Sequence, residues 1–190
     1  FPGMVGTISG MNDAGLAVGT LDVEQSADKS RKFNPTGVPL AFVFSRILEE
    51  CTTVDEAEAL LRSIKPTTWM NLTVCDRDGG ATFEITPNHI GRRDDEEGLV
   101  RCTNHFRCEG MSVGEECWRY DALVDFDGEQ TIDVPAVHER LHAANQGELT
   151  LQTMIFLPRE LVLHLTIGKP PVSDNPLVKI ELAPLFKEQP

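Results

Sequence analysis

Apolar residues recur along the chain with two different spacings, and each spacing predicts one kind of element. Between residues 40 and 64 they return every three or four positions, as on the buried face of a helix. We therefore expect one helix over 40–48 and a second over 53–64. Thr53 and Glu56 have the spacing of a capping box, which marks the start of the second helix.

Short apolar runs bounded by turn residues predict strands. These runs fall into pairs joined by short connections that are rich in Gly, Asp, Asn or Pro, as is typical of hairpins. The expected pairs are 4–9 with 16–23, 69–74 with 81–85, 89–92 with 99–103, and 151–157 with 161–167. The first pair is expected to turn over residues 10–15.

Two further helices are predicted in the second half of the chain. Ser112 and Glu115 form another capping box, which predicts a helix that runs through 118–124, and Asp133 with Pro135 can open a short helix. Helices and strands thus occupy separate blocks, and hairpins rather than βαβ crossovers join the strands. This arrangement predicts an α+β fold built on antiparallel sheets, in one domain over 1–190.

Composition narrows the classes of function. The chain has 190 residues, 41% of them hydrophobic and 25% charged, which is enough apolar material for a globular core. Its net charge of -13 argues against binding to nucleic acid or an anionic membrane, and no apolar run reaches the roughly 18 to 20 residues of a membrane span. Five cysteines without metal-ligand spacing favour reduced thiols and a cytoplasmic location, although the sequence leaves the compartment unknown.

One stretch, His138-Glu139-Arg140-Leu141-His142, matches the H-E-x-x-H pattern of zinc hydrolases. On a helix both histidines project from one face and can share a metal ion, with Glu139 as general base. However, the expected helix is short, no third histidine extends the motif, and the downstream carboxylate, Glu160, lies in a predicted turn. Zinc hydrolysis is therefore a distant alternative, and neither a metal nor another cofactor is expected.

Cys102, His105 and Cys108 offer a second candidate, a Cys–His nucleophile pair near a strand end. Nothing in the sequence orients the histidine, whereas a working pair needs a third group that holds the base in place. We therefore interpret these cysteines as structural thiols.

The opening of the chain carries a more specific pattern, Pro-Gly-x-x-Gly-x-x-x-Gly-Met-Asn-x-x-Gly-Leu-Ala-Val over 2–18. This sequence pattern resembles that of the acyl-coenzyme A:6-aminopenicillanic-acid acyltransferase family, which is related to the choloylglycine hydrolases and penicillin V acylases. The resemblance continues, in order, through 37–39, 53–57, Thr103-Asn104-His105-Phe106 and 168–171. It covers nearly the whole chain.

The resemblance implies an N-terminal-nucleophile hydrolase fold, a four-layer αββα sandwich with antiparallel sheets. In that superfamily a chain-terminal cysteine attacks an amide, and its own α-amino group, with an unperturbed pKa of roughly 8, accepts the thiol proton. Asn104 stands at the place of an oxyanion-hole donor. Asp22 stands where choloylglycine relatives carry a substrate-side Asn or Tyr, so it is the candidate substrate-binding residue. We interpret Asn12 as a turn former.

Residue 1 is Phe, so the nucleophile that the resemblance implies is not at the start of this chain. We expect it upstream, on a strand that precedes the opening hairpin, which makes 1–190 a fragment that is inactive alone. The expected partners are a small-molecule acyl amide or acyl-CoA and the missing N-terminal segment of the same protein, and a homo-oligomer stays open. A non-catalytic binding or structural module of the same fold is the alternative, and the upstream residues would discriminate the two.

Overall fold

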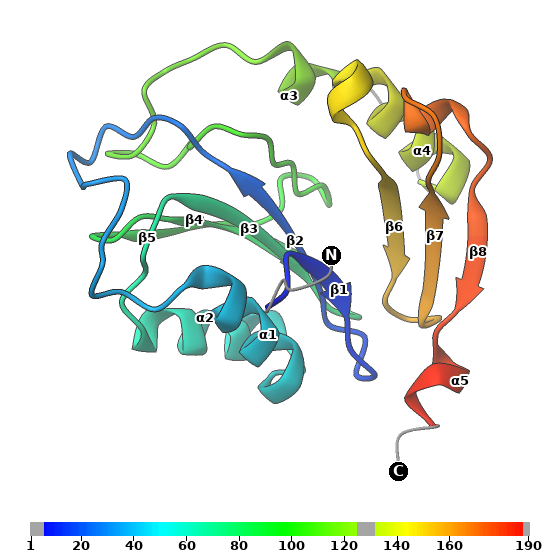
Figure 1. The fold of residues 1–190 in the computed structure, drawn as a ribbon, viewed down its shortest axis with the longest axis horizontal. Coiled ribbons are helices and arrows are strands. Elements are labelled where there is room, and N and C mark those ends of the chain that lie inside the picture. Colours follow the sequence, from blue (N-terminus) through cyan, green and yellow to red (C-terminus); the bar gives the residue numbers. More distant parts are fainter. Residues whose placement is uncertain (1–5, 125–131, 188–190) are drawn as a thin grey trace. The chain divides into compact units, whose positions relative to one another are not determined.

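The computed structural model describes residues 6–124 and 132–187 of the chain. The chain divides into two compact units, residues 1–115 and 116–190, and each is described by itself (Figure 1). The expectation of one domain over 1–190 stays a prediction. None of the helices in the described ranges is long and apolar enough to cross a membrane.

The first unit is built on a five-stranded antiparallel sheet in which each strand pairs with its neighbour in the sequence. Antiparallel neighbours can be joined by short turns, which agrees with the predicted hairpins. The strands are β1 (Ser9–Met11), β2 (Ala17–Asp22), β3 (Met70–Cys75), β4 (Gly80–Ile85) and β5 (Ile90–Arg93). The predicted pair 69–74 with 81–85 is confirmed as β3 and β4.

The first hairpin forms, but its first strand begins later than expected. β1 starts at Ser9, whereas Thr7 donates its backbone N–H to Ala41 O and so leaves the line of the sheet. The part of the predicted strand 4–9 that covers residues 4 and 5 lies outside the described residues. Asn12 forms the turn as interpreted, because its Oδ1 accepts from Leu16 N at 2.8 Å.

Two helices, α1 (Leu40–Glu50) and α2 (Val54–Ser63), cover one face of the sheet, as the spacing predicted (Figure 1). Their apolar sides and alternate residues of β3 and β4 close a core from which water is excluded. Its fully buried side chains include Val43, Phe44, Ile47, Leu61, Leu72 and Phe83.

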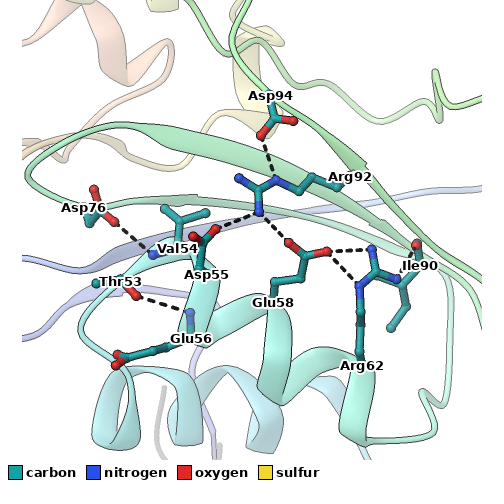
Figure 2. A network of polar contacts seen from close by, with 10 residues as sticks. All are labelled: Thr53, Val54, Asp55, Glu56, Glu58, Arg62, Asp76, Ile90, Arg92 and Asp94. Carbon is teal, nitrogen blue, oxygen red and sulfur yellow. Dashed lines mark hydrogen bonds and ion pairs between the residues drawn. The ribbon is translucent and has the colours of Figure 1, made fainter.

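Figure 2 shows how polar side chains fix the start of α2 and its contact with β5. Thr53 accepts from Glu56 N, as the capping box predicted, but the Glu56 carboxylate reaches Thr52 N rather than Thr53 N. Asp76, from the β3–β4 turn, accepts from Val54 N at 2.9 Å and so satisfies a further N–H at the helix start.

Between α2 and β5, Arg92 of β5 contacts the carboxylates of Asp55, Glu58 and Asp94 (Figure 2). Glu58 also binds Arg62, one turn further along the same helix. Opposite charges three or four residues apart on a helix, and across to the adjacent strand, stabilise the packing of α2 beside β5.

The second unit contains a three-stranded antiparallel sheet in the order β6-β7-β8 together with short helices. Its elements are α3 (Trp118–Ala122), α4 (Val134–Ala143), η1 (Gly147–Leu149), β6 (Thr153–Leu157), β7 (Val162–Thr166), η2 (Val172–Asp174), β8 (Val178–Glu181) and α5 (Ala183–Phe186). The predicted strand pair is confirmed as β6 and β7. The predicted short helix is α4, which Asp133 caps by accepting from Ala136 N.

A helix forms in this stretch, as α3, but the start predicted from Ser112 and Glu115 is wrong, because α3 begins only at Trp118 and ends at Ala122. Ser112 instead accepts from Gly114 N, and Gly114 has a φ of 76°, in the left-handed region that interrupts a helix. The sequence also did not predict β8, whose four residues are mostly exposed and so carry no alternating apolar pattern.

Candidate functional site

Asn104 and Asp22, the two residues that the resemblance singled out, lie together in the first unit. Asn104 Nδ2 donates to the backbone oxygen of Asp22 at 2.8 Å. Asp22 is the last residue of β2 and is exposed, while Asn104 is half-buried in an irregular segment after β5. The carboxamide of Asn104 is therefore held at the end of the strand that forms the opening hairpin.

The predicted strand 99–103 is wrong, because residues 100–108 form no regular element. Side chains take the place of strand pairing over this stretch. Asn71 of β3 is fully buried, and its Nδ2 donates to Thr103 O at 2.8 Å and to His105 O at 3.1 Å. These two carbonyls flank Asn104, so a single buried carboxamide fixes the backbone on both sides of the candidate oxyanion donor.

Glu84 of β4 holds the next part of the segment. Its side chain is fully buried and accepts from the backbone N–H groups of Arg107, at 2.7 and 2.8 Å, and of Cys108, at 2.8 Å. Arg93 donates to the same carboxylate through Nε at 2.7 Å and to Arg101 O through Nη2 at 2.8 Å. A buried carboxylate is stable only with such partners, so this set both neutralises Glu84 and anchors residues 101–108.

Asn71 and Glu84 are direct cross-strand partners in the β3–β4 register. Their sequence neighbours Leu72 and Phe83 belong to the core under the helices, so the two polar residues lie on the other face of the sheet. Gly91 lies on the adjacent strand, and a Cβ added to it would be 2.6 Å from Cys108 Sγ. Only glycine at this position lets the 101–108 segment lie so close to the sheet.

Sequence reasoning missed both Asn71 and Glu84 as parts of the site. The available signal was a polar residue inside each of two otherwise apolar strands, at positions that face one another once the hairpin is built. Asn12 closes its turn, as predicted, and its Nδ2 also donates to Leu48 O in the last turn of α1 and to Cys51 O directly after that helix.

The cysteines do not form the Cys–His nucleophile pair that was considered. Burial raises the pKa of Cys102 to about 11, and burial together with the nearby Glu84 raises the pKa of Cys108 to about 11. His105 Nε2 lies 2.9 Å from Glu115 Oε2 and is thus engaged elsewhere. Thiols with raised pKa values are poor nucleophiles at neutral pH, as structural cysteines are.

The H-E-x-x-H match lies on α4 of the second unit. His142 Nδ1 lies 2.8 Å from Ser173 Oγ and 3.5 Å from Asp174 Oδ1. Among residues 6–124 and 132–187, no three His, Cys, Asp or Glu side chains are grouped so that they could hold a metal ion. The histidine spacing is therefore not accompanied by a third ligand in the described part of the chain.

The antiparallel α+β architecture is shared with solved structures of one class of enzyme fold, that of the N-terminal-nucleophile hydrolases. Two variants of the conjugated bile acid hydrolase from Clostridium perfringens match with TM-scores of 0.66 and 0.65, each at 14% identity, over 100% of this chain and 76% and 75% of theirs. The penicillin V acylase from Agrobacterium tumefaciens matches with a TM-score of 0.42 and 27% identity, over 53% of this chain and 32% of its own. No curated protein matches.

The family model of acyl-coenzyme A:6-aminopenicillanic acid acyl-transferase matches residues 1–152. The chain belongs to this family, as its opening motif predicted. Membership places it among the acyltransferases and amide hydrolases of the N-terminal-nucleophile class.

Proposed function

We propose that the full-length protein transfers or hydrolyses the acyl group of a small-molecule amide or thioester through a cysteine that precedes Phe1. The observation that carries this proposal is the support built around Asn104, whose flanking carbonyls and following N–H groups are all held by fully buried side chains. Such fixed geometry is what an oxyanion donor needs, because a donor that must reorganise stabilises the transition state less.

The cysteines of the described residues favour a nucleophile outside them. Burial raises the pKa of Cys51, and burial with the nearby Asp76 raises the pKa of Cys75 to about 11. Together with Cys102 and Cys108, four of the five thiols in the chain are thus poorly ionised at neutral pH. A nucleophilic cysteine has the opposite property, a lowered pKa or an adjacent base.

In the proposed reaction the terminal thiol attacks the acyl carbon, and its own α-amino group accepts the thiol proton. Asn104 Nδ2 donates to the oxygen that becomes negative, and the amine or thiol leaving group takes the proton as the tetrahedral intermediate collapses. The resulting acyl-enzyme thioester passes its acyl group to water or to an acceptor amine. Asp22, exposed beside Asn104, contacts the substrate.

Replacing Asn104 tests this mechanism. In the full-length enzyme we expect Asn104→Ala to lower kcat by roughly 100- to 1000-fold with a smaller effect on KM, which is the usual result of removing one oxyanion donor. Turnover of a panel of acyl amides and acyl thioesters is the measurement, and mass spectrometry of the mature N-terminus identifies the cysteine.

Gln25→Ala is the matched control, because Gln25 is an exposed carboxamide three residues beyond Asp22. Its kinetics should match those of the original enzyme. An Asn104→Ala enzyme that is as fast as the original, or a mature protein whose N-terminus is not Cys, Ser or Thr, would refute the mechanism.

A further inference from the structure

Two neighbouring pockets lie at one end of the first unit. One has a volume of about 320 Å³ and lies between the loop after β2 and the β4–β5 turn. The other has a volume of about 370 Å³ and lies between the end of α2 and the same turn. They share Lys65, Pro87 and Asn88 in their walls and are therefore adjacent, and we call the two together the basic depression.

The charge of the basic depression is opposite to that of the chain. The chain has 17 Lys and Arg against 30 Asp and Glu. Among the described residues that line the depression, in contrast, no Asp or Glu occurs. The side chains that carry or can take a positive charge there are Lys29, Arg31, Arg62, Lys65 and His89. A local concentration of one sign in a chain of the other sign attracts an anion to that place.

Two carboxylates near the basic depression could reduce its positive charge. Glu58 is paired with Arg62 and Arg92 (Figure 2), which offsets the charge of Arg62. Asp28 accepts from Ser30 N and Ser26 Oγ of its own loop and from Thr86 Oγ1 of the β4–β5 turn, so its oxygens already bond polar groups of the protein. Within the described ranges Lys29, Arg31 and Lys65 take part in no ion pair, and these three cations face the smaller pocket.

The wall that carries these cations is held in place by backbone contacts. Phe33 forms a β-bridge with Thr68, and Asn34 N donates to Thr67 O at 2.7 Å. On the other side of the loop, Val38 N donates to Lys65 O at 2.8 Å. A preorganised wall loses little entropy when a ligand binds, so it favours a specific site over a loose charged patch.

Phe33 adds an aromatic surface to the same pocket. Its side chain is 64% exposed although it is a large apolar group. Aromatic rings beside cations are the usual elements of sites that stack a nucleobase and bind its phosphates. The carboxamide of Asn88 lines the same pocket and can bond the edge of a base.

The register of the sheet places the basic depression near the candidate active site. Asp22 is paired with Met70, Met70 with Ile85, and Ile85 with Ile90, so all four lie at one end of the sheet. The β4–β5 turn, which borders both pockets, begins directly after Ile85. Ile85 and Asp22 are two strands apart, and neighbouring strands are spaced by about 4.8 Å, so the two residues lie about 10 Å from each other.

We propose that the basic depression binds the diphosphate of a nucleoside, with the base on Phe33 and the phosphates on Lys29, Arg31 and Lys65. Two sources share this chemistry, a free nucleoside diphosphate and the nucleotide end of an acyl-coenzyme A. The second source deepens the proposed function, on which it then rests, because it makes the protein a transferase that takes its acyl group from a nucleotide carrier. Lys and Arg bind phosphate oxygens through charge-assisted hydrogen bonds.

The test is titration calorimetry of the full-length protein with ADP, coenzyme A and inorganic pyrophosphate. We expect ADP and coenzyme A to bind, and both affinities to fall as the salt concentration rises. Lys65→Glu and Arg31→Glu should each weaken binding at least tenfold. Phe33→Ala should weaken ADP more than pyrophosphate, since only ADP carries a base.

Lys32→Glu is the matched control. Lys32 is exposed on the same loop and undergoes the same change of charge, but it lines neither pocket. Its affinity for ADP should stay within twofold of that of the original protein. Equal losses in Lys32→Glu and Lys65→Glu would show a general charge effect and overturn the proposal, as would the absence of binding by both ADP and coenzyme A at millimolar concentration.

The two sources are separated by comparing affinities. Coenzyme A that binds at least tenfold tighter than ADP identifies the acyl carrier, and equal affinities identify a free nucleotide. The nucleotide site and the proposed function can be refuted independently. Amide turnover without nucleotide binding would refute only the nucleotide site. Nucleotide binding without turnover of any acyl substrate would refute only the proposed function.

Discussion

At the scale of single residues, the site depends on polar side chains buried in the sheet. Asn71 and Glu84 bond the backbone of the 101–108 segment, which would otherwise contain unpaired buried N–H and C=O groups. Each buried polar atom that loses its partner destabilises the fold by about 1–3 kcal/mol, and more when the atom is charged. The geometry around Asn104 and the stability of the first unit are therefore linked.

Glu84→Gln tests this link. The substitution keeps the shape of the side chain but removes its charge, and it leaves the largely buried Arg93 guanidinium without its carboxylate. Removing one partner of a buried ion pair typically destabilises a protein by about 3–5 kcal/mol, so we expect a loss of about 3 kcal/mol in the free energy of unfolding. Urea denaturation of the full-length protein measures it.

Glu109→Gln is the control for this substitution. It removes the same charge, but Glu109 is exposed and lies one residue beyond Cys108. It should leave the urea midpoint unchanged. A Glu84→Gln protein that is as stable as the control would show that the carboxylate does not anchor the segment.

Residues of this kind are hard to predict from the sequence, for a physical reason. The strand pattern predicted β3 and β4 correctly, yet a polar residue inside a strand ordinarily lies on the solvent face. Whether Asn71 and Glu84 meet solvent or the backbone of a distant segment depends on where residues 101–108 run, and no local pattern specifies that. The family resemblance identified Asn104 and Asp22 as candidates, but it did not identify what holds Asn104 in place.

At the scale of elements, the start of α2 combines two kinds of cap. Thr53 caps the helix from within its own sequence, and Asp76 caps it from the β3–β4 turn. Asp76 also accepts from the N–H groups of Asp78 and Gly79, so the same carboxylate closes the turn. Burial raises the pKa of Asp76, but these three backbone donors outweigh burial and lower the pKa below its usual 3.8.

A pKa that is lower in the folded protein makes stability depend on pH. The unfolded chain then binds the proton more readily, so the contribution of Asp76 is fully present above the unfolded pKa and is lost as the pH falls through the folded pKa. We expect Asp76→Ala to cost about 1 kcal/mol of unfolding free energy at pH 7, as for loss of a helix cap. The difference from the original protein should shrink as the pH is lowered from 6 to below 3.8.

Urea midpoints measured across that pH range test the prediction, with Asp78→Ala as control. Asp78 is exposed in the same turn, and it contributes its backbone N–H rather than its side chain. Its variant should follow the original protein at every pH. A loss in Asp76→Ala that is the same at pH 6 and pH 3 would mean that the carboxylate charge does not stabilise the cap.

Elements with strong periodicity were predictable, and those fixed by long-range contacts were not. The helices α1 and α2 and the pairs β3–β4 and β6–β7 follow from spacing, because their apolar faces are buried against regular neighbours. The stretch 99–103 has the composition of a strand, but in the described part of the first unit it joins no sheet. The side chains of Arg93 and Asn71 bond the carbonyls of Arg101 and Thr103 instead.

At the scale of the whole molecule, the thiols of the chain are arranged to be inert. Cys51 and Cys117 are buried, and the pKa values of Cys75, Cys102 and Cys108 are raised to about 11. An enzyme that uses one reactive cysteine benefits when its other thiols stay protonated, because a thiol is attacked by electrophiles mainly as thiolate.

This arrangement predicts where a thiol reagent reacts in the full-length protein. At pH 8 a thiol with a pKa of about 11 is ionised in about one molecule in a thousand, so alkylation of Cys75, Cys102 and Cys108 by iodoacetamide should be slow and should accelerate as the pH rises toward 11. The proposed nucleophile, which precedes Phe1, has its own α-amino group as base and should react within minutes at pH 7. Peptide mapping by mass spectrometry after a short exposure measures both rates.

Prior incubation with an acyl substrate should protect the upstream cysteine and leave the other rates unchanged, because only the nucleophile becomes acylated. Rapid modification of Cys102 or Cys108 that the substrate suppresses would instead place the nucleophile within this chain and revive the Cys–His pair.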